Sequence, residues 1–232
     1  MHLIDRRNSV IDANHNARKI GRWENSHRNR EGQVDADRDL TLRTAVDLAS
    51  VVGLEGLTIG QLAERLEMSK SGLVGRFGNK ERLQLATLDL AGDMFRQAVY
   101  EPAATEPAGR ARLRAICDAW IRYLGAPCFP GGCFLTTASV EFDGRKGPVR
   151  DAVALALKRW LRVLEAEAET AVTAGELSSD TDPAEVAFTL NALAVGINCD
   201  YQLHGDARAL ELGRRAMASM LARLLDEASL RA

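Results

Sequence analysis

The stretch MSKSGLVGRFGNKERL, residues 68–83, concentrates positive charge in a chain that is close to neutral as a whole. The formal net charge of the 232 residues is −2. Within the stretch a single acid, Glu81, stands beside four cations: Lys70, Arg76, Lys80 and Arg82. Clustered cations bind anions, and the phosphates of nucleic acid are the anions that a short basic helix is suited to meet. The cluster is therefore a candidate DNA contact.

Leu73 and Phe77 are spaced i and i+4 inside this basic stretch, so they fall on one side of a helix. A helix that enters a major groove needs such an apolar side to anchor it and a polar side to face the bases. The exposed side would present Lys70, Ser71, Gly72, Val74, Gly75 and Arg76. Charges alone also fit a solvated surface helix, and the neighbouring elements decide between the two interpretations.

Those neighbouring elements predict two further helices in front of the basic one. Apolar side chains follow the spacing of one helix face: Leu42, Ala45, Val46 and Ala49. Gly53 is placed to end that helix in a left-handed conformation. Thr58 followed three residues later by Gln61 predicts a capping box that opens the next helix. Two helices joined by a tight turn, the second short and basic, indicate a helix-turn-helix.

Three helix starts in this region could also face phosphates. Thr58, Ser69 and Asn79 are residue types that cap helix N-termini. The free backbone N–H groups and the helix dipole at such ends attract anions.

The rest of the chain predicts a helical body. The helix that begins at Lys80 is apolar nearly all round, which suits a strut joining the head to the body. A loop is expected over residues 101–109 and a helix from about Cys133. Long helices are expected over residues 110–124, 148–174, 183–204 and 207–229. No stretch alternates as a strand would, so the predicted class is all-α, a three-helix head on a larger helical body.

The predicted domain organisation has three parts. Residues 1–38 are rich in asparagine, histidine and mixed charge, which is typical of a disordered tail. Residues 39–84 form the DNA-binding head, and residues 85–232 form an effector-binding and dimerisation body. Four scattered cysteines do not suggest a disulfide scaffold, and no apolar run suggests a membrane span or a signal peptide. A cytoplasmic protein without a membrane association is expected.

The stretch RTAVDLASVVGLEGLTIGQLAERLEMSKSGLVGRFGNKERLQLATLDLA, residues 43–91, resembles the DNA-binding head of TetR-family transcriptional regulators. The predicted body helices agree with that family in number and length. The resemblance implies a homodimer that binds a palindromic operator in double-stranded DNA. It also implies release of the operator when a small-molecule effector, apolar or amphipathic, enters the body, and it implies no cofactor and no enzymatic activity.

The resemblance also assigns roles within the head. It implies phosphate contacts at Thr58, Lys70 and Lys80, with the cap at Ser69 beside them. It implies base or groove contacts at Ser71, Gly72, Val74 and Arg76. Many relatives carry an aromatic residue where Val74 stands, so recognition is expected to depend more on Arg76, Lys70 and DNA shape.

Candidate effector-binding residues in the body are aromatic. Seven aromatic side chains could line a cavity, and the five taken as candidates are Trp120, Tyr123, Phe134, Phe142 and Trp160, with Phe188 and Tyr201 as the others. At helical spacing such residues also serve as plain core. The rival classes are an all-α enzyme, for which no catalytic motif occurs, and a ligand-independent DNA-binding protein.

Cysteine and histidine pairs give weak signals of other chemistry. Cys128 and Cys133 flank a glycine-proline turn without further ligands at zinc spacing, so buried or turn-adjacent thiols are favoured over a metal or redox site. Asp200 and His204 at i and i+4 favour a surface pair at a helix end over a metal sensor. No metal site is expected.

The last two helices carry apolar stripes that suit a two-fold four-helix bundle. The residues of these stripes are Leu190, Leu193, Ile197, Met217, Leu221 and Leu224. Exposed stripes of this kind would be a solubility liability in a monomer, so the sequence predicts that they pair across a dimer axis.

Overall fold

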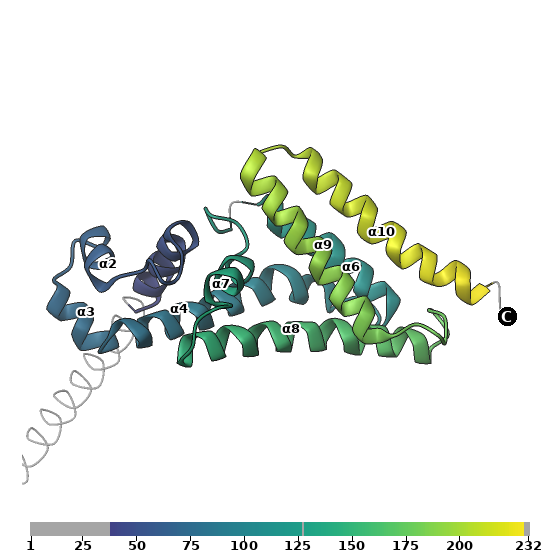
Figure 1. Ribbon diagram of the computed structural model, residues 1–232, viewed down its shortest axis with the longest axis horizontal. Helices are drawn as coiled ribbons and strands as arrows, with labels where there is room; N and C mark the ends of the chain where they lie inside the picture. Colours follow the sequence, from purple (N-terminus) through teal and green to yellow (C-terminus); the bar gives the residue numbers. More distant parts are fainter. Residues whose placement is uncertain (1–37, 127, 230–232) are drawn as a thin grey trace, which may run out of the picture. The chain divides into compact units, whose positions relative to one another are not determined.

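The computed structural model describes residues 38–126 and 128–229, and every regular element among them is helical (Figure 1). The all-α class predicted from the sequence is confirmed. The predicted tail of residues 1–38 lies, except for its last residue, outside the described part of the chain. No helix in the described residues combines the length and the hydrophobicity needed to cross a membrane.

The head consists of short helices around a leucine core. Residues 38–52 are helical, and α2 (Ile59–Arg65) and α3 (Lys70–Phe77) follow before α4 (Lys80–Phe95) begins. α2 packs on α3, and α3 packs on the first part of α4. Five leucines from these helices and from the turn at residues 53–58 have almost no exposed surface: Leu54, Leu57, Leu62, Leu73 and Leu83.

The predicted helix ends of the head are confirmed. Gly53 has a φ of +82°, which suits glycine at the end of the first helix. The capping box of α2 is complete, because Gln61 N donates to Thr58 Oγ1 at 3.2 Å and Thr58 N donates to Gln61 Oε1 at 3.2 Å. Gly72 N donates to Ser69 Oγ at 3.1 Å, and Arg82 N donates to Asn79 Oδ1 at 2.9 Å.

The strut continues further than the sequence predicts. After α4 the chain forms a π-helical turn, η1 (Arg96–Tyr100), and then a short α5 (Glu101–Ala103). The prediction of a loop from residue 101 is therefore wrong for its first three residues. Pro102 lies in the first turn of α5, directly after the π-helical turn.

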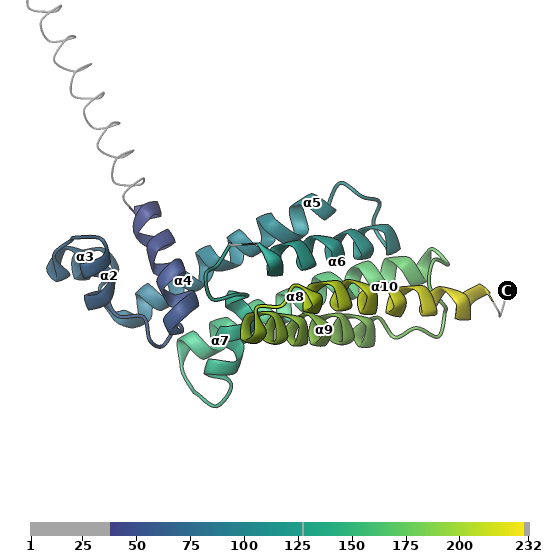
Figure 2. The ribbon, with the colours of Figure 1, turned by 90° about the horizontal axis from the view of Figure 1, so that it is seen from above.

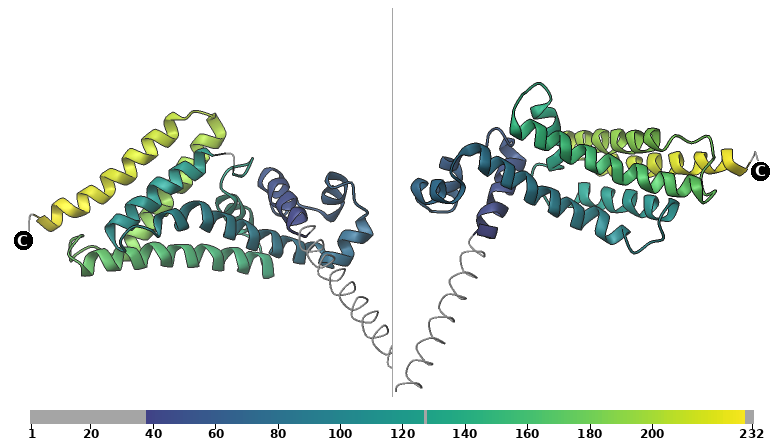
Figure 3. Two further views of the ribbon diagram at one scale, coloured as in Figure 1. Left: turned by 180° about the vertical axis from the view of Figure 1, so that it is seen from behind. Right: turned by 90° about the horizontal axis from the view of Figure 1, so that it is seen from below.

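Five longer helices complete the body, close to the predicted ranges. They are α6 (Arg110–Gly125), α7 (Phe134–Phe142), α8 (Pro148–Thr173), α9 (Pro183–His204) and α10 (Arg208–Ser229). α8 runs beside α4 and α9, and α10 packs on α9 and α6 (Figures 2 and 3). Asp182 caps α9, since its Oδ1 accepts from Ala184 N at 2.9 Å.

Candidate DNA-binding surface and body cavity

α3 presents its polar side to solvent, as its sequence predicts. Leu73 and Phe77 are buried against the rest of the head. The other side chains of the helix are exposed, and Val74 keeps 45% of its surface accessible. The first turn of α3 contains no acid, so no side chain there opposes the approach of an anion. A short, glycine-containing polar surface of this kind has the form needed to lie in a major groove.

Lys70 lies beside the first turn of α2. A Cβ added at Gly60 would stand 3.4 Å from Lys70 Cε, 3.6 Å from its Nζ and 3.8 Å from Thr58 Oγ1. The absence of a side chain at Gly60 therefore leaves room for the lysine to fold over the start of α2. This arrangement brings Thr58 and Lys70, two of the predicted phosphate contacts, to one edge of the head.

Lys80 is engaged within the protein. Its Nζ donates to the backbone oxygen of Glu55 at 2.6 Å and to Glu55 Oε1 at 3.1 Å. Gln84 Nε2 donates to Glu55 Oε2 at 3.1 Å and to Leu54 O at 2.8 Å. The hydrogen bonds from Gln84 and Lys80 lower the pKa of Glu55. Lys80 thus holds α4 to the turn after the first helix, and a phosphate contact would have to share this ammonium group.

A carboxylate from the body binds the same turn. Glu141, on the last part of α7, accepts from Leu54 N through Oε2 at 2.8 Å and from Glu55 N through Oε1 at 3.1 Å. Gly53 permits this approach, because a Cβ there would stand 2.5 Å from Glu141 Oε1. The turn at residues 53–55 is therefore held jointly by α4 and α7, and nothing in the local sequence signals this contact.

The loop of residues 128–133 makes a second connection to the head. Gly131 N donates to Ser50 Oγ at 3.2 Å, and a Cβ on Gly131 would overlap the backbone oxygen of Ser50. Cys133 N donates to Asn198 Oδ1 on α9 at 2.9 Å. A short loop thus contacts the first helix of the head and α9 of the body.

A cavity of about 630 Å³ lies between α4, η1 and α8, with Tyr123 from α6 and two residues of α7 in its wall. Its inner wall is apolar and aromatic, including Phe95, Phe134 and Trp160. Its outer wall includes exposed charged residues, so the cavity reaches the surface. Its size and lining suit a small organic molecule.

Four aromatic rings of the body core, from Phe95, Trp120, Tyr123 and Trp160, form a cluster. Phe95 stands edge-to-face with Trp120, Tyr123 and Trp160 at centroid distances of 5.9, 5.2 and 4.8 Å. Trp120 and Trp160 are 5.0 Å apart, again edge-to-face. A second cavity of about 70 Å³ shares Phe95 and Trp160 with the first and is also lined by Trp120. These rings are part of the hydrophobic core, and they also line the cavities.

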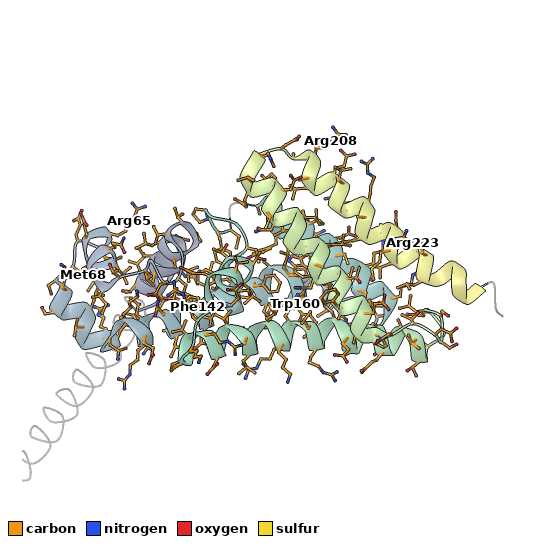
Figure 4. The ribbon with its side chains drawn as sticks, in the orientation of Figure 1. Arg65, Met68, Phe142, Trp160, Arg208 and Arg223 are labelled. Atoms are coloured by element: carbon orange, nitrogen blue, oxygen red, sulfur yellow. The ribbon has the colours of Figure 1, made fainter. Side chains whose placement is uncertain are left out.

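Four of the five predicted aromatic residues line one of these two cavities. Tyr123, Phe134 and Trp160 line the larger one, and Trp120 lines the smaller. Phe142 lines neither: it is buried near the head, with the Arg145 guanidinium 5.3 Å from its ring (Figure 4). Sequence reasoning missed Phe95, which belongs to both walls, because the even spread of apolar residues on α4 indicated only a buried strut.

The cysteines and the Asp200–His204 pair are placed as follows in the structure. Cys117 and Cys133 are buried, Cys128 is half-buried and Cys199 is exposed, and all four are free thiols. Burial raises the pKa of Cys117 to about 12, so this thiol stays protonated. His204 Nδ1 lies 2.9 Å from Asp200 Oδ1 on the exposed end of α9, which is the predicted surface pair.

Four of the six predicted stripe residues face the protomer's own core. Leu190, Ile197, Met217 and Leu221 are buried within a single protomer, so they hold α9 and α10 to the body. Leu193 and Leu224 are only half-buried, and Leu193 lines the open groove between the two helices. Other large apolar side chains of these helices are exposed instead: Phe188 (69%), Leu203 (81%) and Leu212 (45%). Helical periodicity identified the apolar side of each helix but could not tell an intramolecular partner from an intermolecular one.

Two family models match the chain. The one described as "Bacterial regulatory proteins, tetR family" matches residues 42–87, which span the head. The one described as "Tetracyclin repressor-like, C-terminal domain" matches residues 109–217 of the body. No curated protein matches the chain.

Solved structures with the same fold cover most of the chain. A TetR transcriptional regulator from Chloroflexus aurantiacus is 23% identical, with a TM-score of 0.77 over 84% of this chain and 98% of that one. A TetR-family regulator from Cytophaga hutchinsonii is 21% identical, with a TM-score of 0.74 over 83% and 96%. AibR, solved in complex with isovaleryl coenzyme A and operator DNA, is 23% identical, with a TM-score of 0.62 over 81% and 97%.

Proposed function

Because the chain belongs to the TetR family of transcriptional regulators, we propose that it is a repressor that binds a palindromic operator as a homodimer and releases it when a small molecule occupies the body cavity. The observation that carries this proposal is the exposed polar side of α3, supported from behind by buried Leu73 and Phe77. Ser71, Gly72, Val74 and Arg76 on that side are proposed to meet the groove, with Thr58, Ser69, Lys70 and Lys80 proposed to meet phosphates.

A homodimer is supported by the exposed apolar side chains of α9 and α10. Phe188 and Leu203 lie at opposite parts of α9, and Leu212 lies on α10. A shallow groove of small and apolar residues runs between the two helices, with Gly196 and Gly213 in its floor. Such a surface allows close packing of a second copy and would otherwise remain in contact with water.

Release by an effector is supported by the two helices that connect cavity and head. α4 begins against α3 and continues into η1 at the cavity wall. α7 begins with Phe134 and Leu135 at the same wall and ends with Glu141 on the turn of residues 53–55. A molecule that displaces the wall can therefore move both attachments of the head. Linkage requires that the effector weaken DNA binding by the same factor by which DNA weakens effector binding.

Two measurements test this function. Fluorescence anisotropy with an inverted-repeat DNA taken from upstream of the gene should show binding that falls steeply with salt concentration. Light scattering should give about twice the monomer mass of 25.3 kDa. A monomer that binds operator and random DNA equally would contradict the proposed function, since two heads about 34 Å apart are needed for successive major grooves.

A further inference from the structure

Gly75 lies at the centre of the exposed side of α3, and no contact among the described residues accounts for its lack of a side chain. At about 3.6 residues per turn, it stands on the opposite side of the helix from the midpoint between buried Leu73 and Phe77. A Cβ added there would meet nothing within 4 Å in the described part of the chain. Its φ is not in the left-handed region that favours glycine. Alanine would therefore fit this position without strain in the free protein.

Other glycines of the head have a reason within the protein itself. Gly53 and Gly78, which end the first helix and α3, have φ values of +82° and +78°. Within α3, a Cβ on Gly72 would stand 3.2 Å from the Oγ of the Ser69 cap. Glycine is less favourable than alanine inside a helix, so Gly75 carries a cost that its own protein does not offset. The reason for this glycine therefore lies in what α3 contacts.

The residues around Gly75 make the middle of this helix face low and its edges high. Ser71 and Gly72 lie beside it, one turn earlier, and both are small and exposed. Val74 and Arg76 stand at the two edges of the face, each about 100° around the helix from Gly75. A helix of this shape can bring its backbone close to the floor of a major groove, with the two larger side chains on either side of the contact.

The floor of the major groove presents polar base edges and one apolar group, the C5-methyl group of thymine. Gly75 has no side-chain donor or acceptor. A polar base edge pressed against it would lose water without gaining a hydrogen bond. A methyl group in the same place forms no hydrogen bonds with water, and it gains from burial and close packing.

We propose that Gly75 is the point of closest approach between α3 and the operator, and that it packs there on the methyl group of a thymine. This inference rests on the proposed function and adds Gly75 to the residues that determine its sequence specificity. A larger side chain at this position would hold the helix away from the bases. A base pair without the methyl group would leave a gap beneath the helix.

Gly75→Ala separates a requirement of the DNA complex from a requirement of the fold. The melting temperature should not fall, because alanine is favoured over glycine in a helix. The affinity for the operator should fall about 5- to 100-fold, because the added methyl group overpacks the interface. The affinity for random DNA depends on phosphate contacts and should stay within about twofold. Fluorescence anisotropy with the full-length protein measures both affinities.

Removal of a methyl group from the DNA provides the complementary test. Operators in which one thymine of each half-site is replaced by uracil lack that methyl group alone. At the contacted position, the wild-type protein should bind the uracil operator about 2- to 5-fold more weakly. Gly75→Ala should instead bind this uracil operator more tightly than the thymine operator, because the space for its own methyl group is restored. The position at which this reversal occurs identifies the contacted base.

Gly144→Ala is the matched control. Gly144 lies in the turn after α7 and is exposed, and a Cβ there would also have open space among the described residues. This variant should bind the operator, the uracil operators and random DNA as the wild-type protein does.

The proposal is overturned if Gly75→Ala binds the operator as tightly as the wild-type protein, or if it loses affinity for operator and random DNA alike. A lower melting temperature would show that the fold requires the glycine, and the absence of any reversal with uracil would remove the thymine contact; either result overturns the proposal as well. A wild-type protein that binds no operator in the same assay contradicts the proposed function itself. Normal operator binding by both proteins contradicts only the close approach at Gly75.

Discussion

The DNA-binding head and the body cavity differ in how far apart in sequence their working residues lie. In the head, each cap bonds within three residues, as Ser69 does with Gly72, and the polar surface belongs to the single helix α3. In the cavity wall, Phe95 of α4 contacts Tyr123 of α6 and Trp160 of α8, so the contacts join three separate helices. A site built from one helix can be recognised from local patterns, whereas a site built from several helices depends on how they pack.

The difference extends to how each region tolerates change. The exposed side of α3 can change its side chains with less effect on folding than the buried side, because these side chains do not contribute to the core. The cavity wall is also the core, so ligand specificity and stability are coupled there. We expect variants of the head to change either stability or DNA binding, but not both.

Leu73→Ala should lower the free energy of unfolding by about 2–5 kcal/mol, since a fully buried leucine leaves a cavity. Val74→Ala, one residue further on the same helix, should change it by less than about 0.5 kcal/mol because that side chain is half exposed. Urea denaturation followed by circular dichroism measures both. Similar values for the two variants would mean that α3 is not anchored as described.

Arg76→Ala should reduce the preference for operator over random DNA by about 1–3 kcal/mol per half-site if the side chain contacts a base. Lys70→Ala should instead weaken binding to both DNAs alike and lower the salt slope by about one per head, as expected for a phosphate contact. Anisotropy titrations at several salt concentrations separate these effects. An equal loss on both DNAs for Arg76→Ala would reassign it to the backbone.

Glu141→Gln should destabilise the attachment of the head turn to α7 by about 1–3 kcal/mol, because glutamine has only one acceptor oxygen. Its NH2 group would face one of the two donors, Leu54 N or Glu55 N, which now bond to separate carboxylate oxygens. Hydrogen exchange of those two amides measures this effect directly. Glu211→Gln, which removes only an exposed i,i+4 pair with Arg215, is the control and should leave the exchange unchanged. Unchanged exchange in Glu141→Gln would show that α7 does not hold the turn.

The smallest expected effect is a pH dependence from Glu55. The hydrogen bonds from Gln84 and Lys80 lower its pKa below the ordinary value of 4.5. A lowered folded-state pKa means that the stabilisation is present above pH 4.5 and is lost as the pH falls through the folded pKa. Solvent screening at this partly exposed site keeps the effect below about 1 kcal/mol. Glu55→Gln should flatten the acid limb of the stability curve, and an unchanged limb would assign it to other carboxylates.

The sequence by itself determined the all-α class, the helix ends of the head and the side of α3 that faces solvent. These features depend on interactions within one turn of helix, such as the cap at Thr58 with Gln61, and on the periodicity that places Leu73 above Phe77. Such local interactions require particular residue types at fixed separations, so they can be recognised from the sequence.

Only the tertiary structure decided which apolar surfaces meet. It showed that Leu190 and Met217 pack within the protomer, that Phe95 joins Trp120 and Trp160, and that Glu141 binds the turn at residues 53–55. The physical reason is that hydrophobic burial has no direction, so an apolar stripe or ring does not specify its partner. A carboxylate likewise accepts from any amide brought within reach, and packing alone brings Leu54 and Glu55 to Glu141.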